Sequence, residues 1–252
     1  MINTGNYRFR SLFFLMLYLT IAKQMNNIII NIRKVQQTIK QIADDCGRNA
    51  DEICLLAVSK KKPVCDIQAA FDAGQQHFGE NYCQEAEQKI TALKHLDIIW
   101  HFIGPIQSNK TRQISQLFDW VHTVDRLKIA KRLNSQRSAE LSPLNICLQV
   151  NIEQEASKSG IHSDEMLPLA DEISKLQNLN LRGLMAIPSI QQDEQLQRKP
   201  FAQLRELLTQ LQQQHPQCDT LSMGMSNDMN SAIAEGATVV RIGTAIFGER
   251  LK

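Results

Sequence analysis

One lysine stands where a side-chain amine could do covalent chemistry. The segment 55–59 is short and apolar, and Lys60 follows it directly. Because the apolar run would hold the stem of Lys60 against a core, its amine would be partly desolvated, which makes a lysine a nucleophile toward carbonyl groups. Such a lysine can form a Schiff base. The alternative is that Lys60, Lys61 and Lys62 form a solvated basic turn. If the strand continues, alternation places Lys62 on the same face as Lys60, which makes Lys62 the second candidate for the reactive lysine.

Two segments near the end of the chain have the composition of a phosphate-binding site. They read Ser222-Met-Gly-Met-Ser226 and Arg241-Ile-Gly-Thr244. Glycines let backbone N–H groups approach an anion, and serine and threonine hydroxyls add further donors. Either segment alone is a common kind of turn, but together they predict that a phosphate group binds between them.

Two histidines and a further lysine have plainer interpretations. His101 and His122 lie in apolar segments with no partner at metal-ligand spacing, so we expect them to pack inside the protein. Lys158, in the polar segment 155–160, could attract a phosphate, although a solvated turn is the simpler interpretation. No cysteine–histidine cluster has zinc-ligand spacing, and no metal site is predicted.

The elements that would position these residues alternate regularly along the chain. Eight short apolar segments rich in β-branched residues are expected to be strands, with amphipathic helical patterns between them. These segments are 53–60, 77–81, 98–104, 120–125, 144–151, 179–187, 220–224 and 239–248. Because parallel neighbours need a crossover, the alternation predicts a parallel α/β sheet, and eight such units close a (β/α)8 barrel of the TIM type.

The helical patterns support the same architecture. They include 64–73, 83–93, 127–136, 165–176, 201–211 and 230–234, and the pattern over 26–46, ended by Gly47, predicts one more helix before the barrel. An open doubly wound sheet would instead carry a G-x-G-x-x-G turn after its first strand, and that turn is missing. The active site of a parallel barrel lies at the carboxyl ends of its strands, where the lysine and both glycine segments fall.

Composition and charge narrow the class of protein. Of the 252 residues 43% are hydrophobic and 21% charged, which excludes intrinsic disorder. The formal net charge is +2, but the first 24 residues carry three positive charges and no acid, so the rest of the chain has a charge of −1. The near-neutral charge of the rest of the chain gives little electrostatic reason to bind nucleic acid or a membrane surface, and neither is expected as a partner. The six scattered cysteines are expected to be reduced thiols.

Residues 1–24 are expected to lie outside the fold, which would comprise residues 25–252. Arg8 and Arg10 precede an apolar run of 11 residues that is too short to cross a bilayer and ends in Ala22, as in a signal peptide. The other interpretation is that translation starts at Met25, where the helical pattern begins.

Longer motifs resemble one known family. They are L-L-A-V-S-K-K-K-P (55–63), F-G-E-N-Y (78–82), W-H-F-I-G-P-I-Q-S-N-K (100–110), S-K-S-G (157–160), R-G-L-M-A-I-P (182–188), L-S-M-G-M-S-N-D-M (221–229) and V-R-I-G-T-A-I-F-G (240–248). In this order, from residue 25 to the end, the chain closely resembles the pyridoxal-phosphate homeostasis protein family, which itself resembles the N-terminal barrel of bacterial alanine racemases. The resemblance implies pyridoxal 5′-phosphate as cofactor. Because residues 1–24 have no counterpart, it also favours the Met25 start and a cytoplasmic location.

The resemblance also implies roles for individual residues. Lys60 would form the Schiff base, and Arg241 would meet the pyridine nitrogen. The other cofactor-binding residues would be Ser222, Gly243 and Thr244 for the phosphate, Met223 and Ser226 close by, and Asn81 and Met185 at the border of the cofactor. Lys61 departs from the family, in which a small polar residue is common, but alternation points it away from the site.

Two functions fit these residues. One is a carrier that holds the cofactor in the cell and passes it to pyridoxal-phosphate-dependent apoenzymes, and the other is a single-domain amino-acid racemase. A racemase needs a second acid–base residue on the opposite face of the substrate, which the partner subunit's second domain supplies in two-domain racemases. The sequence stops at Lys252 without such a domain. We therefore expect a carrier rather than an enzyme. We also expect the protein to be a monomer.

Overall fold

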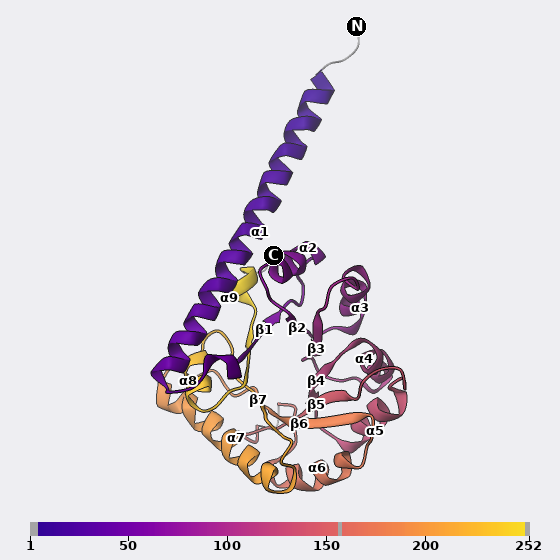
Figure 1. Cartoon of the computed structure of the whole chain (residues 1–252), viewed down its shortest axis with the longest axis vertical. Coiled ribbons are helices and arrows are strands. Elements are labelled where there is room, and N and C mark those ends of the chain that lie inside the picture. Colours follow the sequence, from indigo (N-terminus) through magenta and orange to yellow (C-terminus); the bar gives the residue numbers. More distant parts are fainter. Residues whose placement is uncertain (1–4, 156–157, 250–252) are drawn as a thin grey trace.

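Eight parallel strands form a closed barrel in the computed structural model, which describes residues 5–155 and 158–249 (Figure 1). The strands neighbour one another in chain order, and the last pairs with the first. They are β1 (Cys54–Val58), β2 (His77–Glu80), β3 (Ile99–Phe102), β4 (Trp120–Val124), β5 (Leu144–Gln149), β6 (Leu179–Met185), β7 (Thr220–Ser222) and β8 (Val239–Ile242). The predicted (β/α)8 barrel is confirmed. Ser157 of the S-K-S-G motif and the first four residues of the N-terminal segment lie outside the described residues.

Helices surround the strands and connect them. They are α1 (Gly5–Asp45), α2 (Val64–Asp72), α3 (Cys83–Ala92), α4 (Thr111–Leu117), α5 (Leu127–Gln136), α6 (Met166–Ser174), α7 (Glu194–Gln214), α8 (Met229–Ala234) and α9 (Thr244–Phe247), with short 3-10 turns at Ala50–Glu52, Ser108–Lys110 and Ser163–Glu165. None of the helices in the described part of the chain has the length and hydropathy needed to cross a membrane.

Helix α1 differs from its prediction at one end only. It ends close to the expected position, where Gly47 takes a positive φ of 69°, but it starts at Gly5 rather than near residue 26. Figure 1 shows its first half projecting away from the barrel. From Ile28 onward the predicted apolar face is buried, and Asn31 donates a hydrogen bond of 3.0 Å to the carbonyl of Ile246 in α9. The second half of α1 therefore belongs to the barrel.

Two further boundaries were predicted wrongly. Helix α7 begins at Glu194 rather than at 201, because the Asp193 side chain accepts a hydrogen bond from Leu196 N and caps the helix. Pro200 lies inside this helix and hides its beginning from a pattern search. The last strand stops at Ile242, and the apolar residues after Gly243 form α9 instead of continuing the strand.

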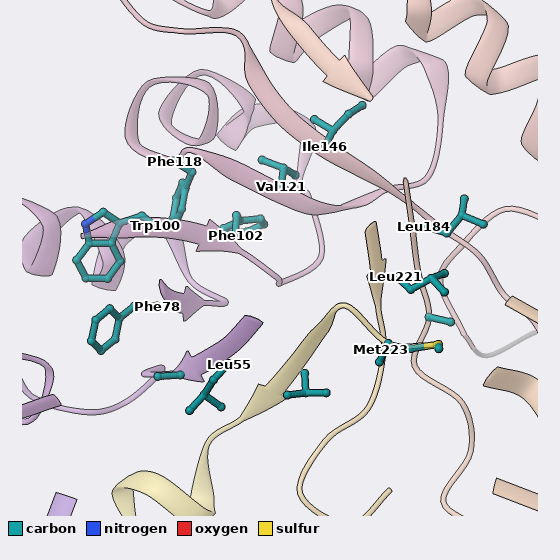
Figure 2. Close-up of a cluster of buried hydrophobic side chains, with 14 of the residues drawn as sticks. Leu55, Phe78, Trp100, Phe102, Phe118, Val121, Ile146, Leu184, Leu221 and Met223 are labelled. Carbon is teal, nitrogen blue, oxygen red and sulfur yellow. The ribbon is translucent and has the colours of Figure 1, made fainter. Parts of the chain in front are cut away.

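The barrel has two buried layers with different chemistry. Apolar side chains on the outer face of the strands pack against the helices, and Figure 2 shows Phe78, Trp100, Phe102 and Val121 among them, with Phe118 at the end of α4 against Phe102. Inside the barrel, Leu56, Ile103 and Val239 form a small separate apolar cluster. The rest of the interior includes buried polar groups on β3, β4, β7 and β8, which can meet only across the inside of a closed barrel.

Strands β6 and β7 approach each other closely at Gly183. This glycine has a φ of 152°, and a Cβ atom placed on it would lie 2.0 Å from the carbonyl oxygen of Thr220. The strand register between β5 and β6 also shifts next to it. A side chain at this position would therefore push the two strands apart.

We predict that Gly183→Ala lowers the free energy of unfolding by about 2–4 kcal/mol, since it adds a backbone clash to an unfavourable φ. Gly74→Ala is the matched control, because Gly74 also has a positive φ, 94°, but no atom lies within 4 Å of the place that a Cβ would take there. The control should cost about 1–2 kcal/mol. Urea unfolding of both variants checks this, and equal losses would contradict the close approach.

Candidate functional site

A cavity of about 430 Å³ opens at the carboxyl ends of the strands. Its lining comes from the turn after β1, the end of β2, the loop after β7 and the end of β8. Of the nine predicted cofactor-binding residues, six lie around it: Lys60, Asn81, Ser226, Arg241, Gly243 and Thr244. The structure thus brings residues far apart in sequence to one cavity, at the end of the barrel where the prediction placed them.

The other three predicted residues lie behind the cavity wall. Met185, Ser222 and Met223 are completely buried. The Ser222 hydroxyl lies 2.7 Å from His122 Nδ1 and 2.9 Å from Arg241 Nη1, inside the barrel. The predicted phosphate residues that do face the cavity are Ser226, Gly243 and Thr244.

The backbone on both sides of Lys60 is fixed by hydrogen bonds. Ser59 N donates to Gly79 O in β2 at 3.0 Å, and Lys62 N donates to Ser59 O at 3.0 Å. Lys61 takes a positive φ of 60°, and its N–H donates to the carboxylate of Glu85. Lys61 is exposed and points away from the cavity, as alternation predicts. Lys60 therefore leaves the barrel from a firmly held turn.

A buried ion cluster supports this turn from outside the barrel. The ammonium of Lys89 in α3 is 2.7 Å from Glu80 Oε1, 2.6 Å from Glu85 Oε1 and 2.8 Å from Ser59 O. Glu80, at the end of β2, also accepts a bond of 2.6 Å from Ser59 Oγ. Burial raises the pKa of Glu80, although Lys89 and Ser59 oppose the shift. This cluster was missed in the sequence, where the Glu85–Lys89 spacing of four residues on a helix was its one visible signal.

Arg241 lies at the floor of the cavity and is almost fully buried. Its Nη1 donates to Ser222 O at 2.6 Å, and its Nη2 donates to Ala186 O at 3.0 Å. Burial lowers the pKa of Arg241 to about 10, a shift that the carboxylate of Asp228 opposes. The guanidinium is therefore still charged at neutral pH, and the carbonyls of Ala186, just after β6, and of Ser222 in β7 hold it in place.

The second candidate lysine has a structural role. Lys62 lines the same cavity as Lys60, as alternation predicts, but its ammonium donates to the carbonyls of Phe247, Gly248 and Glu249 at 2.9, 3.1 and 3.3 Å. These bonds join the turn after β1 to the end of α9. Lys62 thus closes one wall of the cavity.

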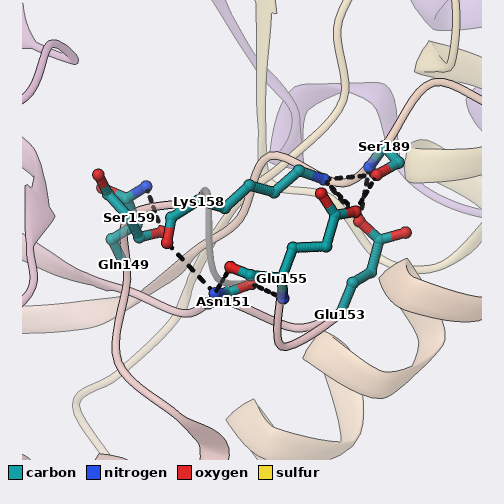
Figure 3. Close-up of polar contacts among 7 residues, drawn as sticks. All are labelled: Gln149, Asn151, Glu153, Glu155, Lys158, Ser159 and Ser189. Carbon is teal, nitrogen blue, oxygen red and sulfur yellow. Dashed lines mark hydrogen bonds and ion pairs between the residues drawn. The ribbon is translucent and has the colours of Figure 1, made fainter.

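Lys158 lies in an ion-paired loop beside a neighbouring cavity of about 290 Å³ (Figure 3). Its ammonium is 2.7 Å from Glu153 Oε2, 3.2 Å from Glu155 Oε1 and 2.6 Å from Ser189 Oγ. Partial burial lowers the pKa of Lys158, but the two carboxylates outweigh this effect and raise it. The ammonium is thus already neutralised by carboxylates. The turn was expected to be solvated, but ion pairs and a hydrogen bond of Lys158 hold it in place.

The structure also places the other polar residues that the sequence singles out. His101 and His122 are buried inside the barrel, which confirms that they pack there. No group of residues in the described part of the chain could hold a metal ion. All six cysteines lie in this part, and each is a free thiol. The carboxylate of Asp228, which caps Met225 N at 2.5 Å beside the cavity, was overlooked although it belongs to the S-N-D-M motif.

Fold and site together define a class of protein. The family model described as "Alanine racemase, N-terminal domain" matches residues 30–251. An alanine racemase of Clostridium difficile has the same fold, with a TM-score of 0.72 at 12% identity over 90% of this chain and 58% of its own. The chain is therefore a barrel of the alanine racemase N-terminal type.

Curated relatives identify the particular family. A pyridoxal phosphate homeostasis protein of Pseudomonas aeruginosa is 54% identical over 90% of this chain and 97% of its own length, and that of Escherichia coli K12 is 52% identical over 90% and 98%. The structure of PipY from Synechococcus elongatus with PLP bound matches with a TM-score of 0.73 and 38% identity over 83% of this chain and 99% of its own. The chain belongs to the pyridoxal phosphate homeostasis protein family, as the motifs predict.

We predict that Lys89→Met destabilises the protein by about 3–5 kcal/mol at neutral pH, because it leaves Glu80 buried without its cation. The pKa of Glu80 is already raised, so its folded state binds a proton more tightly than the unfolded chain does, and stability falls as pH rises above the ordinary value of 4.5. The loss of unfolding free energy in Lys89→Met, relative to the parent protein, should therefore become smaller as the pH is lowered toward 4.5. Urea unfolding between pH 4.5 and 8 measures it.

The double variant Glu80→Gln, Lys89→Met is the control for this interpretation. It removes the uncompensated charge and should recover part of the lost stability at neutral pH. If the double variant is as unstable as Lys89→Met, the loss comes from packing rather than from the buried charge.

Proposed function

We propose that this protein binds pyridoxal 5′-phosphate in the 430 Å³ cavity, holds it through a Schiff base with Lys60, and serves as a carrier in pyridoxal-phosphate homeostasis. The observation that supports this most strongly is that Lys60 and Arg241 line one cavity together with Ser226, Gly243 and Thr244. The names of the curated relatives and the bound cofactor of PipY point to the same ligand.

The residues around the cavity suit this ligand. Lys60 and Arg241 supply an amine and a guanidinium, and Ser226 and Thr244 supply hydroxyl donors. Asn81 Oδ1 is buried at the wall without a hydrogen-bond partner in the described part of the chain, so a ligand hydroxyl can satisfy it. When bound, the cofactor supplies an electrophilic aldehyde and an electron-poor ring.

Each residue has a distinct task in this proposal. Lys60 provides the nucleophilic amine, and the hydrogen bonds around its turn direct it into the cavity. Arg241 has only N–H donors and keeps its charge, so it would donate to a pyridine nitrogen and favour the unprotonated state of that nitrogen. An unprotonated ring draws electrons less strongly, which argues against transamination but suits carriers and racemases alike.

The titratable groups of the cavity favour a carrier over a racemase. Besides Lys60, the described titratable residues that line it are Lys62, Asp228 and Arg241. Lys62 is bonded to three carbonyls, Asp228 caps a backbone N–H, and Arg241 does not give up its proton near neutral pH. No described cavity residue is thus placed as a second acid–base group beside Lys60, which two-sided proton transfer at a substrate carbon requires.

The proposal extends to the setting of the protein. We propose that residues 25–252 are the working domain, since the family model starts at residue 30 and relatives match over nearly their whole length. The protein would act as a monomer in the cytoplasm, and its recipients would be apoenzymes that use the same cofactor. Because this domain is nearly neutral, it would recognise such a partner by the complementary shape of the two surfaces rather than by long-range electrostatic attraction.

We predict that the purified protein binds pyridoxal 5′-phosphate with an absorbance band in the visible range, and that borohydride fixes the cofactor on Lys60. Peptide mapping of the reduced protein locates the modified lysine. Lys60→Ala should lose the band, while Lys61→Ala, which changes an exposed neighbour, should keep it. Label on Lys62 or Lys158 in the parent protein would refute the assignment of Lys60.

We also predict that the loaded protein does not racemise amino acids. The reason is that proton return from the face opposite Lys60 has no suitable side chain in the described cavity. Incubation with L-alanine in D₂O, followed by NMR of the α-proton and chiral chromatography, measures exchange and D-isomer separately. Slow exchange without D-alanine fits a carrier, whereas D-alanine formation at about 1 s⁻¹ or faster would identify a racemase.

A further inference from the structure

A row of hydrogen-bonded side chains runs from Arg241 through the inside of the barrel. Arg241 Nη1 lies 2.9 Å from Ser222 Oγ, which lies 2.7 Å from His122 Nδ1. His122 Nε2 lies 2.9 Å from His101 Nδ1, and His101 Nε2 lies 2.9 Å from His77 Nδ1. We call these three histidines and Ser222 the histidine chain.

The histidine chain spans the barrel. Arg241 lines the cavity at the carboxyl ends of the strands, whereas His77, at the start of β2, lines an open cavity of about 520 Å³ at their amino ends. His101 and His122 between them are buried, and the Trp120 ring stacks on His101 at 5.5 Å between centroids. Both ring nitrogens of His101 and of His122 have partners, so turning either ring over would break two hydrogen bonds.

The histidines of the chain are neutral at neutral pH. Burial and the charge of Arg241 lower the pKa of His122 to about 3, and burial together with the neighbouring histidines lowers the pKa of His101 well below 6.5. Burial also lowers the pKa of His77, although Asp119 opposes this shift. Each ring therefore carries one N–H and one bare nitrogen.

Arg241 determines which group donates and which accepts in every hydrogen bond of the histidine chain. A guanidinium can only donate, so Ser222 Oγ must accept from it. The other described partner of this hydroxyl is His122 Nδ1, so the hydroxyl hydrogen points there and His122 Nδ1 is bare. His122 then has its hydrogen on Nε2 and donates to His101.

The same reasoning continues to the end of the chain. His101 accepts at Nδ1 and must donate from Nε2 to His77, which in turn accepts at Nδ1 and keeps its hydrogen on Nε2. The opposite direction would leave the Ser222 hydroxyl hydrogen without a partner at a completely buried site.

We propose that Arg241 fixes all three histidines of the chain as Nε2–H tautomers, and that Ser222 and His122 in return are positioning residues for Arg241. A hydroxyl that donates to His122 becomes a stronger acceptor for the guanidinium, because bonds in a chain polarise one another. The chain thus holds Arg241 at the cavity floor. Its bearing on the cofactor rests on the function proposed above, but the tautomers do not.

Nitrogen-15 NMR of histidine-labelled protein without cofactor tests the tautomers directly. Long-range proton–nitrogen correlation spectra distinguish Nδ1–H from Nε2–H rings, and single His→Gln variants assign the signals. We expect the Nε2–H pattern for His77, His101 and His122 in the parent protein. An Nδ1–H pattern for His101 or His122 would overturn the proposal.

Ser222→Ala tests whether Arg241 sets the direction. This variant removes the hydroxyl that accepts from Arg241 and donates to His122, so His101 and His122 should show mixed tautomers. His215, which lies outside the histidine chain and pairs with Asp171 at 2.9 Å, should keep its tautomer. Unchanged Nε2–H patterns in folded Ser222→Ala would mean that something other than Arg241 sets the direction. Circular dichroism confirms that the variant is folded.

The positioning role is tested by cofactor retention. Dialysis of folded Ser222→Ala loaded with pyridoxal 5′-phosphate should show binding about 5- to 10-fold weaker than the parent, with a shifted absorbance band, while His215→Gln should match the parent. Parent-like retention and absorbance in Ser222→Ala would refute the positioning role. If the parent protein itself binds no cofactor, the proposed function fails, and the NMR result still decides the tautomers.

Discussion

The buried ammonium of Lys89 is the constraint on which the mouth of the barrel depends. A charge without water must be surrounded by oxygens of matching geometry, and here they come from the end of β1, the end of β2 and helix α3. Satisfying this one group aligns two strand ends and fixes the turn that follows β1. Lys60 and Asn81 leave the sheet from those two ends, so their places at the cavity are set by a cluster that lies outside it.

The outer face of the barrel sheet stabilises the fold, whereas its inner face holds the polar groups that reach the cavity. The outer face is apolar and packs against helices, which supplies the hydrophobic stabilisation of the barrel. The inner face can therefore hold polar groups, provided that each finds partners, and Arg241 and the histidine chain do so with one another. A charged residue at the floor of the cavity is stable because the neighbouring strand β7 and the residue after β6 bring carbonyl and hydroxyl oxygens to it.

The sequence predicted the architecture well because it follows from local patterns. Short apolar runs alternating with amphipathic helices specify a parallel barrel, and parallel strands bring their carboxyl ends together whatever the details of packing. Boundaries failed where one residue type masked a pattern, as Pro200 does in α7, or where an apolar run continued into another element, as it does after Gly243.

The candidate site was predictable in part. Lys60, Arg241 and Thr244 follow from strand ends and from the family resemblance. The different directions of Ser222 and Ser226 do not, because the turn between them passes through Gly224 with a φ of 90° and sends one hydroxyl into the barrel and the other to the cavity. The partnership of His122 with Ser222 joins opposite sides of the barrel, and no spacing along the chain reveals it.

The wall that Lys62 closes has a mechanical consequence. Helix α9 is attached to the turn after β1 by the bonds of one ammonium to three carbonyls, and to α1 by side-chain contacts, rather than by strand pairing. The described strand pairs all lie outside this wall, which is held by these bonds and by the burial of Ile246 and Phe247 in the hydrophobic core. Loss of the Lys62 bonds would therefore weaken the boundary of the cavity without breaking a strand pair.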